Sequence, residues 1–200
     1  MKYLYLLYAL AVAVMSGGFV SCAMAEETIT DASDAAGEGA DVTDSKIRSC
    51  INNMKAVSGK VNTKAEIYVI IAFTDFHVDN LCEREPDIKE VAKAFKKGGV
   101  AKILQKIQKK KNVQTILAVE EGTNLKHVKK HIVKWLGLKC PIMVYKTDDE
   151  AFIDVVGDGD MVVAYSKNDK FIVDGSIDMV AHTMDRFLKE LNKWIAEHKN

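Results

Sequence analysis

The sequence predicts an α/β domain with a mostly parallel central sheet, helices on both faces, and a C-terminal antiparallel hairpin followed by a helix. Two observations lead to this prediction. Short apolar runs typical of buried strands alternate with amphipathic helical patterns, which favours parallel strands joined by helices. The last two strand-like runs are separated by only a few polar residues, which is typical of a hairpin.

The clearest strand pattern is "EIYVIIAF" (residues 66–73), a nearly continuous β-branched and aromatic run that predicts a strand buried on both faces. A helical stripe at residues 45–57 precedes it, and Gly59 ends that helix. Further helices are expected at residues 86–97, 100–111, 123–138 and 184–198, with a short helix and loop at 149–160. Further strands are expected at residues 112–121, 141–147, 161–166 and 170–177.

The first 25 residues are interpreted as an export signal, because Lys2 precedes an apolar stretch too short to span a bilayer. Two processing patterns compete. "AMA" (residues 23–25) suits a signal peptidase and gives a mature start at Glu26, whereas "FVSC" (residues 19–22) resembles a lipobox that would make Cys22 a lipidated N-terminus. The expected location is therefore periplasmic or secreted, or membrane-anchored through Cys22, in a compartment where disulfides persist.

Residues 26–45 form an acidic segment with seven acidic residues and no basic one, and we expect a disordered tether there. The predicted domain, residues 46–200, carries 27 basic and 21 acidic residues. Fourteen lysines and only three acidic residues lie between residues 89 and 139. Such a run is usually a solvated face; the sharper alternatives are an anionic surface, an acidic partner, or the chain's own tether. Nucleic acid is not an expected partner, because no aromatic residues interleave with "KIQKKK".

The sequence contains four cysteines, at positions 22, 50, 82 and 140, and no C-x-x-C motif. Cys50 lies on the apolar face of the first helix and Cys140 precedes a strand, so both are interpreted as core residues or as disulfide partners of Cys82. Which cysteines pair cannot be read from the sequence.

Cys82 is the candidate catalytic thiol. It lies between a strand that ends at Phe73 and a helix predicted to begin at Pro86, and a helix N-terminus favours the thiolate form. His77 and Arg84 are positioned to lower the pKa of this thiol further, whereas three nearby acidic residues would raise it. The alternative is a buried structural cysteine.

No metal site and no cofactor are expected. The "GDGD" run at residues 157–160 lacks the spacing and closing glutamate of a calcium loop, and a tight turn explains it better. His127 and His131 have a spacing that can hold a metal on a helix, but no third ligand is evident in the sequence.

This order of elements resembles the thioredoxin-like fold, in the variant found in exported TlpA/ResA proteins and peroxiredoxin-like proteins. Two local features carry the resemblance over residues 60–200. Phe73 and Pro86 have the separation of the family pattern F-x-A-x-W-C-x-x-C-x-x-E-x-P. The run "AYSKNDKFIVDG" (residues 164–175) resembles the family's late hairpin, with Asp169 in the place of the turn glycine.

The chain departs from that family at the site itself. Aligning Phe73 and Pro86 with the pattern puts the two family cysteines at Val78 and Leu81, so Cys82 is one residue late. The family's cis-proline falls near Asp160, where this chain has no proline. The peroxiredoxin pattern T-x-x-C also fails.

The resemblance implies an exported thioredoxin-like protein of envelope thiol–disulfide homeostasis, acting through the single thiol of Cys82. A lone cysteine would work through mixed disulfides with a thiol substrate or an unknown protein partner. The alternative is a catalytically inactive thioredoxin-fold domain that binds a partner. Whether the chain is an enzyme stays open at this point, because a fold alone does not license a function.

Overall fold

The computed structural model describes residues 45–84, 88–177 and 181–198. Within these residues, six strands form one sheet in the order β1-β4-β3-β2-β5-β6. The central strands β2, β3 and β4 are parallel, and β5 and β6 form an antiparallel hairpin beside β2. The predicted α/β architecture, with its terminal hairpin and final helix, is therefore confirmed. The expected signal peptide and all of the expected tether except Ser45 lie outside the described residues.

The strands are β1 (Lys55–Ser58), β2 (Ile67–Phe73), β3 (Val113–Glu120), β4 (Ile142–Tyr145), β5 (Met161–Ser166) and β6 (Phe171–Ser176). The α-helices are α2 (Lys46–Asn53), α3 (Asp75–Asp79), α4 (Ile88–Lys97), α5 (Val100–Gln108), α6 (Leu125–His127), α7 (Val133–Leu136), α8 (Glu150–Val156) and α9 (Ala181–Glu197). Two π-helical segments, η1 (Asn80–Arg84) and η2 (Val128–Ile132), continue α3 and α6.

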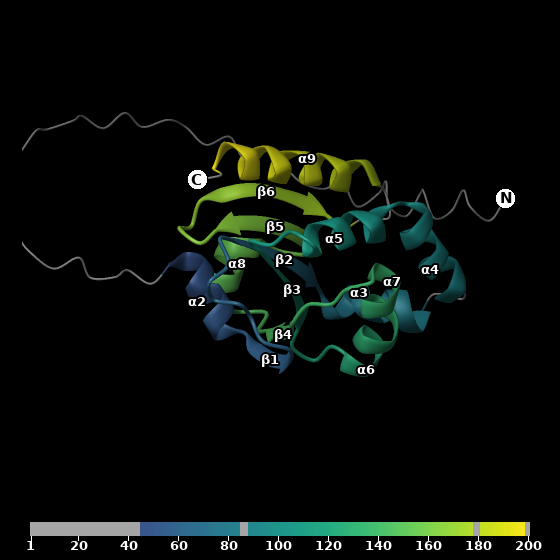
Figure 1. The fold of residues 1–200 in the computed structure, drawn as a ribbon. Helices are drawn as coiled ribbons and strands as arrows, with labels where there is room; N and C mark the ends of the chain where they lie inside the picture. The colour runs from purple at the N-terminus through teal and green to yellow at the C-terminus, as the bar shows by residue number, and fades with distance from the viewer. Residues whose placement is uncertain (1–44, 85–87, 178–180, 199–200) are drawn as a thin grey trace, which may run out of the picture. The chain divides into compact units, whose positions relative to one another are not determined.

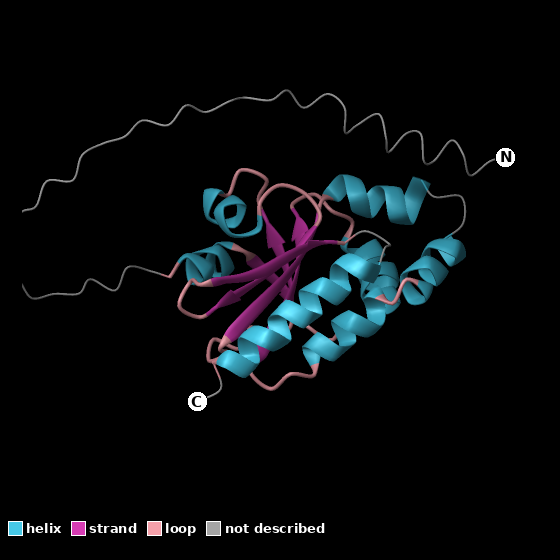
Figure 2. Cartoon of the chain, turned by 90° about the horizontal axis from the view of Figure 1, so that it is seen from above, coloured by secondary structure: helices cyan, strands magenta, loops and turns pink. Residues whose placement is uncertain are grey.

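Strand β2 divides the interior into two hydrophobic cores. Every residue of β2 is buried, and alternate side chains point to opposite faces of the sheet. On one face, the core contains side chains from α3, η1, α4, α5, α7 and α9. On the other face, the core contains side chains from α2 and α8. Figures 1 and 2 show helices on both sides of the sheet, as the sequence predicted.

Two segments differ from the sequence prediction. Residues 55–58, expected at the end of the first helix, form the edge strand β1, which pairs antiparallel with β4. Residues 75–84, expected to connect a strand to a later helix, are themselves helical as α3 and η1. Both segments are short, so tertiary pairing and capping decide their conformation more than local propensity does.

The hairpin between β5 and β6 caps the N-terminus of α2. Asp169 has φ 61°, the left-handed conformation that aspartate adopts more readily than most residues with a Cβ. Its carboxylate Oδ1 accepts hydrogen bonds from the Ser45 hydroxyl (2.6 Å) and from the Ile47 N–H (2.9 Å). Partial burial raises the pKa of Asp169, but the hydrogen bonds from Ile47 and Ser45 outweigh it, and the pKa is lowered overall.

Replacing Asp169 tests this long-range cap. We expect Asp169→Ala to reduce the free energy of unfolding by about 1–2 kcal/mol, as for the loss of a helix N-cap. Asp169→Asn should cost less, because asparagine keeps an acceptor and tolerates positive φ. Urea denaturation measures both changes, with exposed Asp148→Ala as the control.

The contribution of Asp169 to the stability of the fold depends on pH in a definite direction. Because the pKa of Asp169 is lowered in the folded state, its stabilisation is present above the ordinary carboxyl pKa and is lost as the pH falls through the folded value. The difference between the wild type and Asp169→Ala should therefore shrink in acid. The cap would be contradicted if the difference in the free energy of unfolding between the wild type and Asp169→Ala did not change in acid. It would also be contradicted if Asp148→Ala lost as much stability as Asp169→Ala.

Candidate functional site

A group of polar side chains lies where the parallel strands end. Thr74 directly follows β2, Glu120 is the last residue of β3, and Tyr145 is the last residue of β4. Asp160 immediately precedes β5, which runs antiparallel to β2, so Asp160 reaches the same edge of the sheet. In open α/β sheets, ligands bind outside the carboxyl ends of the strands. We call the set Thr74, His77, Glu120 and Asp160 the polar edge.

Asp160 ties together the start of α3 and the loop before β5. Its Oδ1 accepts from the Thr74 N–H at 2.8 Å and lies 3.3 Å from the Thr74 hydroxyl. Its Oδ2 lies 2.5 Å from Nδ1 of His77. The Thr74 hydroxyl in turn accepts from the His77 N–H at 3.2 Å, as the N-cap of α3. The imidazole of His77 is thus held through Nδ1, and its side chain remains 30% exposed.

The loop "GDGD" delivers Asp160 to this position. Gly157 has φ 83° and Gly159 has φ 99°, conformations that residues with a Cβ rarely adopt. The sequence favoured a tight turn here, and the structure has a bend over residues 158–160 with two glycines of positive φ.

Glu120 makes the second link of the polar edge. Its Oε2 accepts from the Asp75 N–H at 2.8 Å, and its Oε1 accepts from the Thr147 hydroxyl at 2.7 Å. The buried Tyr145 hydroxyl donates to the Phe73 carbonyl at 3.4 Å. Burial raises the pKa of Tyr145, and the nearby Glu120 and Asp160 carboxylates raise it further, so the phenol stays protonated.

Cys82 lies inside the hydrophobic core, in a helical segment. Helix α3 runs over Asp75–Asp79, and Cys82 lies in the π-helical segment η1 that follows it; Cys82 is 5% exposed. Val78 and Leu81, which align with the two family cysteines, are buried in the same core. The helix N-terminus that was expected to favour its thiolate, at Pro86, lies outside the described residues, so that effect on Cys82 stays a prediction.

Of the other two cysteines, Cys50 is buried and Cys140 is half-buried. Burial raises the pKa of Cys50 to about 12, and the Asp149 carboxylate adds to the shift. Burial also raises the pKa of Cys140 to about 11, even though backbone hydrogen bonds lower it. No disulfide joins the cysteines of the described residues. The sheet separates Cys50 from Cys82 and Cys140, and a disulfide needs Cα atoms within about 7 Å, so a Cys50–Cys82 bridge does not fit this fold.

Of the other predicted site residues, His77 is paired with Asp160 and has an edge-on ring contact with Phe73. The side chain of Arg84 and the whole of Cys22 lie outside the described residues. Whether His77 and Arg84 modulate a thiol therefore stays a prediction. Within the described part of the chain, no group of three or more His, Cys, Asp or Glu side chains is arranged to hold a metal ion. None of the described helices is long and apolar enough to cross a membrane.

Sequence reasoning missed Phe76, Glu120 and the role of Asp160. The Phe76 side chain is 66% exposed on α3, next to His77. The available signal was positional: Glu120 lies at the end of the strand predicted over residues 112–121, and Asp160 immediately precedes the strand predicted over residues 161–166. That Asp160 meets Thr74, 86 residues away in the sequence, follows only from the antiparallel pairing of β5 with β2.

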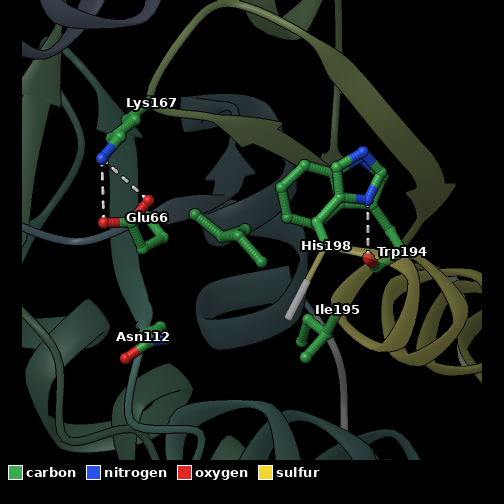
Figure 3. Close-up of a pocket in the computed structure, with 7 residues that line it drawn as sticks. Glu66, Asn112, Lys167, Trp194, Ile195 and His198 are labelled. Carbon is green, nitrogen blue, oxygen red and sulfur yellow. Dashed lines mark hydrogen bonds and ion pairs between the residues drawn. The ribbon is translucent and has the colours of Figure 1, made fainter. Parts of the chain in front are cut away.

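The opposite end of the sheet has a pocket of about 420 Å³, lined by Glu66, Asn112, Lys167, Trp194 and His198 among others. Figure 3 shows that its two charged side chains face each other, and Lys167 Nζ lies 2.9 Å from Glu66. The His198 ring stacks on Trp194 at 4.2 Å between ring centroids. Because these groups are engaged with one another, we do not take this pocket as the functional site.

No protein-family model matches this chain, and no curated protein matches it. Solved structures do show similarity. An uncharacterized thioredoxin-like protein from Porphyromonas gingivalis is 17% identical, with a TM-score of 0.46 over 74% of this chain and 91% of that one. A secreted Mycobacterium tuberculosis disulfide oxidoreductase is 10% identical, with a TM-score of 0.40 over 64% and 81%. The Xanthomonas campestris bacterioferritin comigratory protein is 13% identical, with a TM-score of 0.40 over 70% and 90%.

All three TM-scores are below 0.5 and all three identities are below 25%. The thioredoxin-like fold is therefore assigned from this chain's own element order and strand pairing. The activities named for those three proteins are not assigned to this chain on the basis of these similarities.

Replacing Asp160 tests the polar edge. We expect Asp160→Ala to reduce the free energy of unfolding by about 1–3 kcal/mol, because the Thr74 N–H and the His77 ring lose their shared acceptor. Amide hydrogen exchange at Thr74 should also accelerate. Asp158→Ala, in the same turn and exposed, is the matched control for urea denaturation and exchange. Equal effects of the two substitutions would show that the turn, not the carboxylate contacts, is what matters.

Proposed function

We propose that this chain is an exported thioredoxin-fold domain that binds a polypeptide partner at its polar edge and does not catalyse thiol–disulfide exchange. One observation carries the proposal. The positions that align with the family's two cysteines are Val78 and Leu81, and both are packed in the core beside Cys82. The edge where the related proteins place their dithiol instead presents His77, Asp160 and the exposed Phe76.

The state of the thiols supports this proposal. A catalytic cysteine needs an accessible thiolate, and reactive cysteines lie in electropositive, partly exposed surroundings. Cys82 is 5% exposed among apolar side chains. The raised pKa values of Cys50 and Cys140 keep both thiols protonated near neutral pH.

The polar edge has the anatomy of a small interface. Binding energy at interfaces is concentrated in a few aromatic anchors surrounded by a polar rim. Phe76 supplies an exposed aromatic ring at the start of α3, and the neighbouring His77 and Asp160 supply partly exposed polar groups. The hydrogen bonds of Thr74 and Glu120 hold the start of α3 in place, so the anchor is presented on a rigid element.

Export is the part of this proposal that rests on the sequence. The signal-like residues 1–25 and the acidic residues 26–45 support a domain carried on a flexible tether outside the cytoplasm. Processing before Glu26 would give a periplasmic or secreted protein, and processing before Cys22 would give an anchored lipoprotein.

A second candidate function is thiol–disulfide exchange through Cys82 alone. The observation that favours it is the π-helical segment at Asn80–Arg84, because π-helical turns occur frequently at functional sites. In this mechanism the Cys82 thiolate would attack a substrate disulfide and release one substrate thiolate, and a partner thiol would then resolve the mixed disulfide. Local opening of α3 and η1 would have to expose the thiol first.

Thiol reactivity separates the two functions. We expect the protein exported by a bacterial host to react slowly with iodoacetamide until it is unfolded, because Cys50 and Cys82 are buried and the half-buried Cys140 has a raised pKa. Intact mass spectrometry, with and without prior reduction, counts the alkylated thiols and also identifies the mature N-terminus. The alkylation rates of Cys50 and Cys140 should keep rising as the pH is raised toward their values of about 12 and 11.

The Cys82→Ser variant is the control that assigns each adduct. Rapid alkylation of folded protein at neutral pH that disappears in Cys82→Ser would favour the single-thiol function. An alkylation rate that rises with pH and already reaches its plateau by about pH 8 would likewise indicate a thiol of low pKa.

A photo-crosslinking residue in place of Phe76 tests the binding edge directly. We expect discrete crosslinked species when this variant is expressed and exported in its host. The same residue in place of Phe171, which is 50% exposed on β6, is the matched control. Equal crosslinking from both positions, or none from position 76, contradicts binding at the polar edge.

A further inference from the structure

One face of the domain is lined with lysines. The helices α4, α5, α6 and α7 cover the same side of the sheet, and their apolar side chains form part of one core. The lysines of these helices point away from that core: all are exposed, including Lys102 and Lys106 on α5 and Lys130 and Lys134 beside and on α7. We call the exposed lysines of residues 89–139 the basic face.

The basic face is only weakly neutralised. Between residues 89 and 139 there are fourteen lysines, no arginine and three acidic residues. Glu90 pairs with Lys93 at 3.6 Å on α4, and Glu120 is engaged at the polar edge. Six acidic residues and no basic one occur at residues 148–160, whose helix α8 packs on the opposite side of the sheet. Positive and negative charge are therefore segregated across the domain.

We propose that the basic face docks the domain onto the surface of an anionic phospholipid bilayer. The residue composition of the basic face favours binding to a uniformly charged surface over binding to a specific protein partner. Lysine acts as a flexible point charge, whereas arginine is the residue that recognises carboxylates in a fixed bidentate geometry. The exposed large apolar side chains of the described residues are Phe76, Ile153 and Phe171, and none belongs to the basic face. An interface with a protein would normally contain such anchors.

A hollow in the basic face suits a phosphate headgroup. Lys109 and Lys139 line a pocket of about 490 Å³ between the end of α5 and the segment after α7, together with Gln105 and Gln108. The Gln108 side chain braces it: Oε1 accepts from the Lys139 N–H at 2.6 Å, and Nε2 donates to the Gly137 carbonyl at 3.4 Å. Two lysines thus line a concave site within the charged face.

This inference goes beyond the proposed function, because it concerns a different surface and a different partner from the polar edge. The sequence left an anionic surface as one of three alternatives for the lysine run; the structure adds that these helices share one side of the sheet and that two of the lysines line a hollow. Stable attachment to a membrane usually needs two signals, and a basic patch is a common second one.

Vesicle co-sedimentation tests the proposal on the exported, mature protein. We expect binding to vesicles of phosphatidylcholine mixed with phosphatidylglycerol, and substantially less to pure phosphatidylcholine. A lipid on Cys22 would insert into both, so the difference between the two isolates the charge effect. Binding should fall by at least about tenfold between about 0.1 M and 0.5 M salt, because the Debye length shortens from about 10 Å to a few ångströms.

Charge reversal identifies the face. The variant Lys102→Glu/Lys106→Glu/Lys130→Glu/Lys134→Glu should lose at least about tenfold in affinity for the anionic vesicles. Lys55→Glu/Lys60→Glu/Lys64→Glu/Lys170→Glu makes the same change in net charge at exposed lysines outside the basic face, and should bind like the wild type. Lys109→Gln/Lys139→Gln should weaken binding through the headgroup pocket. Thermal melts confirm that each variant is folded.

Several results would overturn the proposal. Equal losses in the two reversal variants would mean that only net charge matters. Binding to soluble poly-glutamate but not to anionic vesicles would identify an acidic polypeptide as the partner. If vesicles bind only after the acidic residues of 26–44 are replaced by amides, the chain's own tether occupies the face. Failure of the crosslinking at Phe76 would leave this result unaffected, so the two proposals can fail separately.

Discussion

Strand β2 is the element on which the rest of the structure depends. All seven of its residues are buried, so it supplies side chains to both hydrophobic cores at once. Its neighbours are the parallel strand β3 on one side and the antiparallel strand β5 on the other. This arrangement brings the end of β3 and the beginning of β5 to the end of β2. The polar edge exists because these three strand ends meet.

At that edge, carboxylates stabilise the start of helix α3, and this role does not involve a thiol. Asp160 and Glu120 accept backbone N–H groups at the start of α3, where a helix has unsatisfied donors. The same carboxylates raise the pKa of Tyr145, which bonds the carbonyl of the last residue of β2. The helix that follows β2 is therefore held at its N-terminus by polar contacts and along its length by apolar ones. Cys82 lies among these apolar contacts, so its side chain is buried in the hydrophobic core and is not exposed at the surface.

The charge distribution gives the domain two distinct surfaces. The polar edge lies at the ends of the strands, whereas the basic face covers the outer side of the helices on one face of the sheet. Six acidic residues lie at residues 148–160, whose helix α8 packs on the opposite side of the sheet, and seven more occur in the sequence at residues 26–45. A net charge of zero over the whole chain thus conceals a strongly polarised domain. Such a field orients a protein as it approaches a charged surface, and this effect weakens as salt is added.

The sequence by itself determined the elements whose burial pattern is local. The β-branched run of β2, the amphipathic stripes of α4, α5 and α9, and the hairpin at Asp169 were all predicted from side-chain periodicity and turn chemistry. The sequence also singled out Cys82 and His77, because their residue types carry chemistry. It could not decide whether Cys82 was exposed, since that depends on which way α3 and η1 face the sheet.

Only the tertiary structure decided the contacts between distant segments. Strand β1 forms because β4 offers it a pairing edge, and α2 begins where Asp169, more than 120 residues later, caps it. Asp160 meets Thr74 and His77 because β5 runs antiparallel to β2. The periodicity of apolar residues indicates which side of a helix or strand faces the core. Hydrogen bonds between elements depend instead on the order and the register of the strands. That is the physical reason why the core was predictable here and the polar edge was not.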